Sequence, residues 1–153
     1  MNTKAEKRSR ILLRVRSRTE GRARRAFDRA AAGLREIDAR LAVLERALWD
    51  YDDAARRATN SGGDRSVLAG YGRRTGDIRR ALKRVRERRR AAGRLFGRRR
   101  QDLVRAHRLR RASDEYHARI VRAAHARQRR EAAKEFDDIH AARTAGGSGP
   151  VEV

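Results

Sequence analysis

The histidines and the acidic residues near the C-terminus are the side chains of this chain best suited to metal or acid–base chemistry. Asp137 and His140 are three residues apart, which on a helix would provide half a metal site. No two of the four histidines are four residues apart; they are His107, His117, His125 and His140. A charged helix face in contact with solvent explains these residues more simply, so we expect no metal and no cofactor.

Nucleophilic and phosphate-binding motifs are also missing from the sequence. The chain has no cysteine and no G-x-S-x-G sequence for a nucleophile elbow. The pair Gly62-Gly63 lacks the G-x-x-x-x-G-K-[ST] context of a phosphate loop. We therefore expect a protein that is not an enzyme and has no small-molecule substrate.

Arginine gives the chain a strong but unevenly distributed positive charge. The net charge is +22, from 42 Lys and Arg against 20 Asp and Glu, and residues 73–111 alone carry 18 basic and three acidic side chains. Such a segment attracts phosphates by counterion release. Phe96 is its only aromatic residue, so a stacking platform for single strands is missing. A basic coiled-coil nucleic-acid-binding protein is therefore one hypothesis, and a basic face that meets an acidic protein surface is the simpler one.

The elements that carry these residues are predicted by the spacing of apolar side chains. Nine apolar or aromatic residues follow alternating steps of three and four: Phe27, Ala30, Leu34, Ile37, Leu41, Leu44, Leu48, Tyr51 and Ala55. Four heptads of this pattern indicate a coiled-coil helix, which we place at about residues 5–57.

A turn and a second helix are predicted to follow. Residues 58–66 contain Asn, Ser, Gly and Asp, which are typical of turns, and either Asp64 or Ser66 can cap the next helix. From there Leu68, Tyr71, Thr75, Ile78, Leu82 and Val85 repeat the steps of three and four. The second helix is expected over about 67–142, with Arg89 and Arg99 weakening its apolar register.

Together these elements predict an all-α protein, a long two-helix antiparallel coiled-coil hairpin over residues 1–145. Residues 146–153 are expected to be a disordered tail. Because the second helix is longer, it should overhang the first by residues 120–142, leaving Ile120, Ala124, Phe136 and Ile139 without cover from this chain. No apolar run is long enough to span a membrane and the N-terminus is polar, so we expect a soluble, cytoplasmic protein.

Several short motifs, in order, resemble the FliJ family, the small coiled-coil component of the flagellar type III export apparatus. Residues 48–56, LWDYDDAAR, end the first helix, and Leu68-x-x-Tyr71 opens the second after a glycine-containing turn. The basic run RRRQDLVRA follows at 98–106, and KEFDDIHA at 134–141 is similar to the family's terminal acidic pair. The resemblance covers about residues 5–143.

The resemblance implies a helical stalk that inserts its open end into a hexameric export ATPase and regulates it. It further implies contacts with a membrane export gate and with export chaperones, at the inner face of the cell membrane at the flagellar base. The equivalent stalk of a virulence-type secretion system fits equally well. By match to the family, and with the overhang included, the ATPase contacts would be Ile120, Glu135, Phe136, Asp137, Asp138 and Ile139. Gate contacts would be Leu48, Tyr51, Leu68, Tyr71 and Ile78, for which hairpin core is the simpler explanation.

Overall fold

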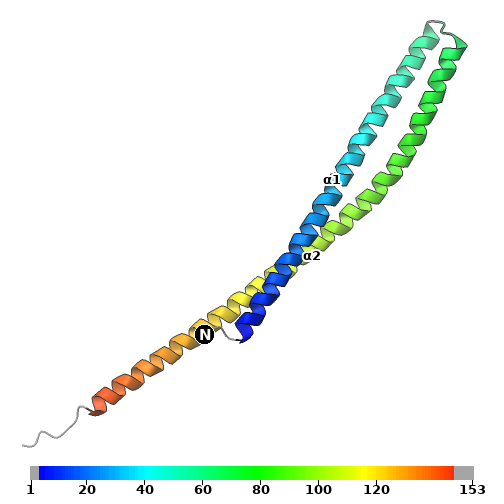
Figure 1. Cartoon of the computed structure of the whole chain (residues 1–153). Coiled ribbons are helices and arrows are strands. Elements are labelled where there is room, and N and C mark those ends of the chain that lie inside the picture. Colours follow the sequence, from blue (N-terminus) through cyan, green and yellow to red (C-terminus); the bar gives the residue numbers. More distant parts are fainter. Residues whose placement is uncertain (1–3, 147–153) are drawn as a thin grey trace, which may run out of the picture. The chain divides into compact units, whose positions relative to one another are not determined.

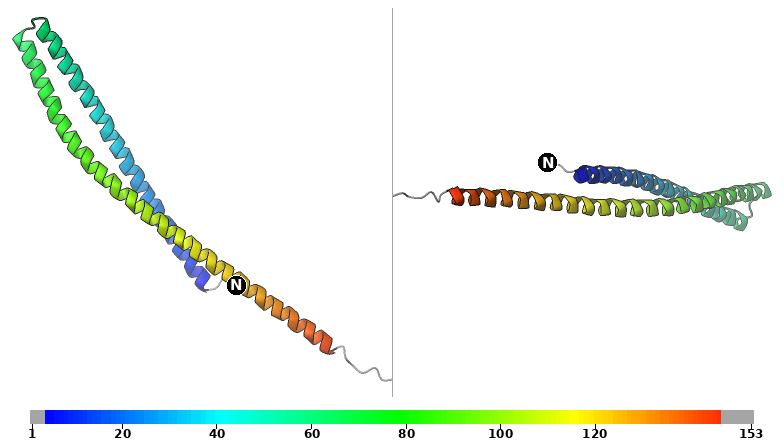
Figure 2. Two further views of the ribbon diagram at one scale, coloured as in Figure 1. Left: turned by 180° about the vertical axis from the view of Figure 1, so that it is seen from behind. Right: turned by 90° about the horizontal axis from the view of Figure 1, so that it is seen from below.

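The computed structural model describes residues 4–146 and shows two long α-helices in close contact (Figure 1). Helix α1 spans Lys4–Asn60 and helix α2 spans Arg65–Gly146. No strand occurs among the residues that the structure describes. The predicted all-α hairpin is therefore confirmed. Figure 2 shows each helix from two further directions, with both continuous from end to end.

Both helices are a few residues longer than the sequence predicts. The first extends to Asn60 rather than to about 57, which shortens the connecting turn to residues 61–64. The second begins at Arg65 and includes Gly146, which was predicted to belong to the tail. The predicted disordered tail otherwise lies outside the described residues. The added residues at the C-terminal end include Ala, Arg and Thr, none of which stops a helix.

The turn between the helices is a helix C-cap followed directly by a helix N-cap. The N–H of Gly63 donates to the carbonyl of Ala58 at 2.8 Å and that of Gly62 donates to Thr59 at 3.2 Å, which is the Schellman pattern. Gly62 has a φ of 72°, a left-handed conformation that favours glycine. Asp64 then accepts the N–H of Ser66 at 3.1 Å. The chain thereby reverses within four residues.

The chain divides into two compact units, of which Glu20–Arg105 contains the turn. In this unit the predicted register of α1, from Phe27 to Ala55, is half-buried throughout. Its partners on α2 include Leu82, which is 3% exposed, and Phe96, whose ring lies 5.1 Å from that of Phe27. A continuous apolar contact between antiparallel helices therefore holds this unit together.

Ion pairs flank this apolar contact along one side. Asp38, Glu45 and Asp52 follow one another at heptad spacing on α1. Each carboxylate pairs with an arginine of α2: Asp38 with Arg89, Glu45 with Arg86 at 3.0 Å and Asp52 with Arg79 at 3.5 Å. The arginine that interrupts the predicted register at position 89 is thus an ion-pair partner whose head remains exposed.

In the other unit, residues 4–19 pack against the part of α2 that begins at Ala106, and the contact is polar. Its buried residues are Glu6, Ser9, Ala106 and Ser113. The Ser9 hydroxyl donates to the Glu6 carbonyl at 3.0 Å and lies 2.8 Å from Nδ1 of His117. Ser113 donates to the carbonyl of Leu109. Hydrogen-bonded polar side chains therefore take several of the buried positions in this unit, beside half-buried apolar ones such as Leu13 and Ile120.

Candidate protein-binding surfaces

A long stretch of α2 near its C-terminal end has no cover from α1. Ala126 is the last half-buried residue, and every residue from Arg127 to Arg143 is exposed. We call residues 127–143 the protruding segment. It is shorter than the overhang predicted at 120–142, because Ile120 and Ala124 are still half-buried. A single helix in water is only marginally stable, so this segment is suited to a partner.

Apolar and acidic side chains gather near the end of the protruding segment. Phe136 is 70% exposed and Ile139 is 56% exposed, and their spacing of three residues puts them on one side of the helix. Glu135, Asp137 and Asp138 beside them are exposed as well. The structure thus brings five of the six predicted ATPase-contact residues together. Ile120, the sixth, lies apart in the half-buried region.

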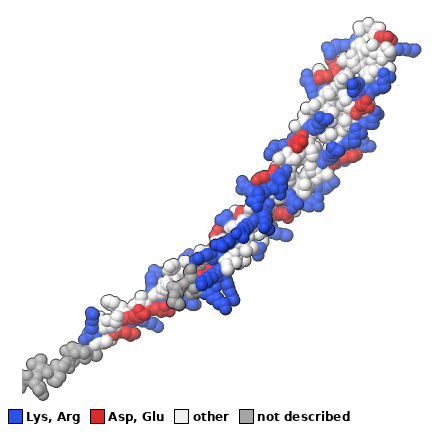
Figure 3. Space-filling view, in the orientation of Figure 1, with Lys and Arg blue, Asp and Glu red and all other residues white. Residues whose placement is uncertain are grey.

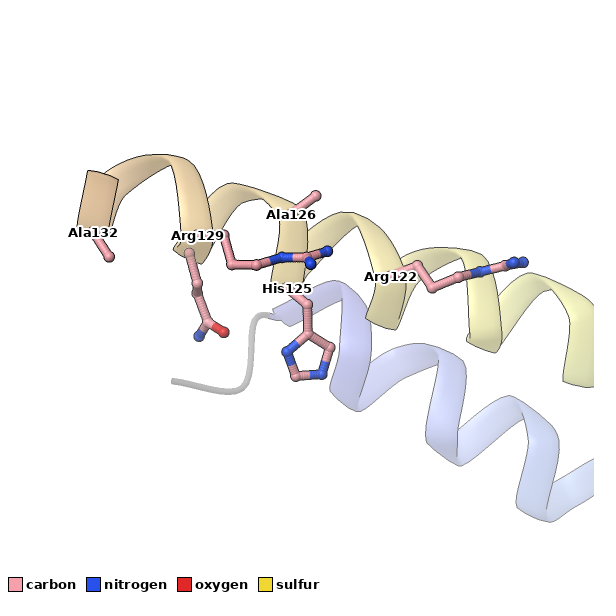
Figure 4. A pocket seen from close by; sticks show the side chains of 6 residues that line it. Arg122, His125, Ala126, Arg129 and Ala132 are labelled. Carbon is pink, nitrogen blue, oxygen red and sulfur yellow. The ribbon is translucent and has the colours of Figure 1, made fainter. Parts of the chain in front are cut away.

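A shallow groove occupies α2 just before and within the protruding segment (Figure 4). Its walls combine guanidinium, imidazole and amide groups with small apolar ones: Arg122, His125, Ala126, Gln128, Arg129 and Ala132. All six residues belong to one helix, so the groove is an open surface and offers no enclosure for a substrate. Within residues 4–146, no three His, Cys, Asp or Glu side chains are grouped in a way that could hold a metal ion.

The five predicted gate residues lie close to the turn and within the contact between the helices. Leu48, Tyr51, Leu68, Tyr71 and Ile78 are all half-buried. The rings of Tyr51 and Tyr71 meet edge to face with centroids 6.3 Å apart. These residues therefore pack the hairpin core, and only the outer part of each tyrosine borders a surface depression near the turn, beside Val67 and Arg74.

The sequence analysis missed one feature of the surface and one of the helix contact. Trp49 is 60% exposed on α1, with the Arg46 guanidinium 5.1 Å from its ring centre, and Val43 nearby is 61% exposed. The polar register around Ser9 and Ser113 was also missed, although it continues the same steps of three and four. Polar residues alternate there with apolar ones such as Leu13 and Ile120, so the apolar pattern is interrupted.

The Asp64 carboxyl group at the turn has a clearly lowered pKa. The backbone N–H of Ser66 and then its hydroxyl donate to this carboxylate and lower its pKa from the ordinary 3.8. Hydrogen bonds to the charged form favour ionisation. This shift belongs to helix capping.

Neither helix contains a segment long and apolar enough to cross a membrane, among the residues searched from 4 to 146. No family model, curated protein or solved structure matches the chain.

Proposed function

We propose that the chain is a non-enzymatic helical stalk that binds and regulates the hexameric ATPase of a flagellar-type protein export apparatus. The observation that carries this proposal is the protruding segment, where Phe136 and Ile139 are exposed beside three carboxylates. Exposed large apolar groups rimmed by charge are typical of protein-binding sites. The motif resemblance of residues 134–141 to the FliJ family supplies the identity of the partner.

The proposed mechanism follows from a mismatch of symmetry. A ring of six identical subunits offers six equivalent sites around its pore, and one helical stalk contacts them unequally. Subunits that touch Phe136 and Ile139 gain apolar contacts that the opposite subunits lack. Because a ligand shifts a conformational equilibrium by its differential affinity, the stalk favours one subunit conformation over another and promotes ring assembly and hydrolysis.

The proposal includes the export gate and the export chaperones as further partners. The depression near the turn, bordered by Tyr51 and Tyr71, supports a gate contact because it exposes aromatic edges beside Arg74. Binding there would hold the chain at the inner face of the membrane without a span of its own. A virulence-type secretion system would use the same surfaces, so the host's set of export genes decides between the two.

The direct test is ATP hydrolysis by the host's export ATPase, with and without the full chain, at physiological salt. We expect clear stimulation by the natural chain and its loss with Phe136→Ala/Ile139→Ala. Truncating a side chain that dominates an interface costs about 2 kcal/mol or more, and every 1.4 kcal/mol is tenfold in affinity.

A matched control uses two apolar residues with similar exposure elsewhere. Ile11 is 61% exposed and Val15 is 51% exposed, and both lie on α1. Ile11→Ala/Val15→Ala should stimulate the ATPase like the natural chain. Equal loss from both double variants, or no stimulation and no co-purification with the natural chain, would contradict the proposal.

A further inference from the structure

The outward face of α2 between residues 73 and 105 carries an excess of cations. In the heptad repeat of α2, Leu82 and Phe96 occupy positions that contact α1. The heptad positions on the opposite side of the helix therefore point away from α1. Fifteen residues occupy these outward positions, and eight of them are basic and exposed. We call them the arginine row: Arg73, Arg80, Lys83, Arg84, Arg90, Arg94, Arg98 and Arg105.

The folded chain does not neutralise this row. Of its eight members only Arg80 has an ion-pair partner in the described structure, namely Asp77 in the preceding turn. The carboxylates of α1 point elsewhere, because Glu45 and Asp52 pair with arginines that flank the helix contact. Basic side chains outnumber acidic ones on the face shown in Figure 3.

Interactions within the folded chain do not account for the arginine row. Arg80 with Arg84, Arg90 with Arg94, and Arg94 with Arg98 are each four residues apart on one helix. Like charges at that spacing repel and destabilise a helix. A bias of base composition can explain arginine in place of lysine. The outward positions also hold two acidic residues, Asp77 and Glu87, against the eight basic ones, so a large excess of positive charge remains on this face. A ligand that supplies negative charge would remove the repulsion.

From this arrangement we infer that the outward face of α2 binds the phosphate backbone of duplex nucleic acid without sequence preference. The row extends from Arg73 to Arg105, about 48 Å at the rise of an α-helix. An extended, regular series of phosphates matches such a line, and guanidinium groups bind phosphate oxygens in pairs. The flexible arginine stems let the heads adjust to the phosphate spacing.

The residues that lie between the cations indicate that the ligand is a nucleic-acid duplex and not another polyanion. The outward positions include no aromatic residue on which the bases of a single strand could stack. Val104 is the only large aliphatic residue among them, whereas a helix that lies on a membrane inserts a broad apolar face. This site is separate from the protruding segment and does not rest on the proposed function.

The test measures binding of the full chain to a labelled 30-base-pair duplex of random sequence, from 50 to 200 mM salt. Contact with six to ten phosphates should lower the affinity about 10³- to 10⁵-fold over this range. The variant Arg84→Gln/Arg90→Gln/Arg94→Gln/Arg98→Gln should reduce the slope of log affinity against log salt by about 3.6, since each phosphate contributes about 0.9.

The matched control removes four exposed arginines from outward positions of α1, in the variant Arg22→Gln/Arg29→Gln/Arg35→Gln/Arg56→Gln. Both variants have the same net charge, and circular dichroism should show that both are helical. The control should keep most of the natural salt slope. Equal loss from both variants, or no duplex binding at 50 mM salt, would overturn the inference. Binding to phosphatidylserine vesicles without binding to the duplex would also overturn it and indicate a membrane surface.

Discussion

At the scale of single residues, the turn depends on one glycine for its conformation and another for its space. Gly62 has a left-handed φ of 72° with nothing within 4 Å of an added Cβ, whereas a Cβ on Gly63 would lie 2.8 Å from the carbonyl oxygen of Ala58. A substitution at Gly62 would therefore strain the backbone, and a substitution at Gly63 would cause a clash with the backbone of Ala58. Neither restriction could be read from the dipeptide Gly-Gly, although its place after a helix indicated a turn.

We expect Gly62→Ala to destabilise the protein by about 1 kcal/mol, because left-handed backbone costs a residue with a Cβ about 1–2 kcal/mol. In a chain of this size that lowers Tm by roughly 2–4 °C. Gly33→Ala is the control, since Gly33 lies within α1 with open space around it and alanine favours helix. Thermal unfolding should move in opposite directions for the two variants; a shift in the same direction would contradict the account of the cap.

Asp64 makes a pH-dependent contribution to stability. Hydrogen bonds from Ser66 lower its pKa in the folded state below the ordinary 3.8. Its stabilising effect is therefore present above about pH 4 and is lost as the pH falls through the lowered pKa. Asp64→Asn keeps an acceptor for the Ser66 N–H but carries no charge to interact with the helix N-terminus.

The measurement is Tm of the natural chain and of Asp64→Asn between pH 2 and pH 7. The natural chain should be the more stable one at neutral pH, and the difference should shrink at the acidic end. A difference that is constant across this range would show that the charge of Asp64 has no part in capping.

At the scale of elements, the pairing of α1 with α2 is set by an apolar register and by charges beside it. The steps of three and four predicted the positions of contact from Phe27 to Ala55 correctly, because burial selects apolar side chains at the helix-contact positions. The ion pairs of Asp38, Glu45 and Asp52 were not predicted, although their heptad spacing was visible in the sequence. Which arginine each would meet depends on the exact length of the turn.

The pair of Glu45 and Arg86 allows a test of that alignment. Glu45→Arg alone should lower stability because it places a second cation beside Arg86, and adding Arg86→Glu should restore part of the loss. Exposed pairs of this kind couple by about 0.2–1 kcal/mol in double-mutant cycles. Glu36→Arg is the control, since Glu36 is exposed and forms no ion pair within the described structure. A coupling energy of zero would show that this ion pair does not stabilise the alignment of the helices.

At the scale of the whole molecule, the two units are built from different kinds of contact. The unit that contains the turn has an apolar core around Leu82, whereas the other buries Glu6, Ser9 and Ser113. Sequence analysis predicted helices across both units but did not anticipate the polar contact, because Ser9 and Ser113 interrupt the apolar periodicity there. The protruding segment was predicted from helix lengths alone, and its start was placed seven residues too early.

Amide hydrogen exchange should reveal this difference as a gradient of protection. Residues 127–143 should exchange fastest, because no other helix covers them. Residues 6–16 should be intermediate, and residues 30–51 and 75–96, which share the apolar core, should be slowest. Equal protection of residues 6–16 and 30–51 would contradict the assignment of a weaker, polar contact to the first of them.

The four-residue turn also has a consequence for how the chain reaches its fold. Tyr51 and Tyr71 are close together in sequence, whereas Ser9 and His117 are 108 residues apart. Closing the longer loop first would cost about 1.5 kcal/mol more in chain entropy than closing the shorter one. Folding should therefore nucleate at the turn and proceed like a zipper, so that the polar contacts around Ser9 form last and open first.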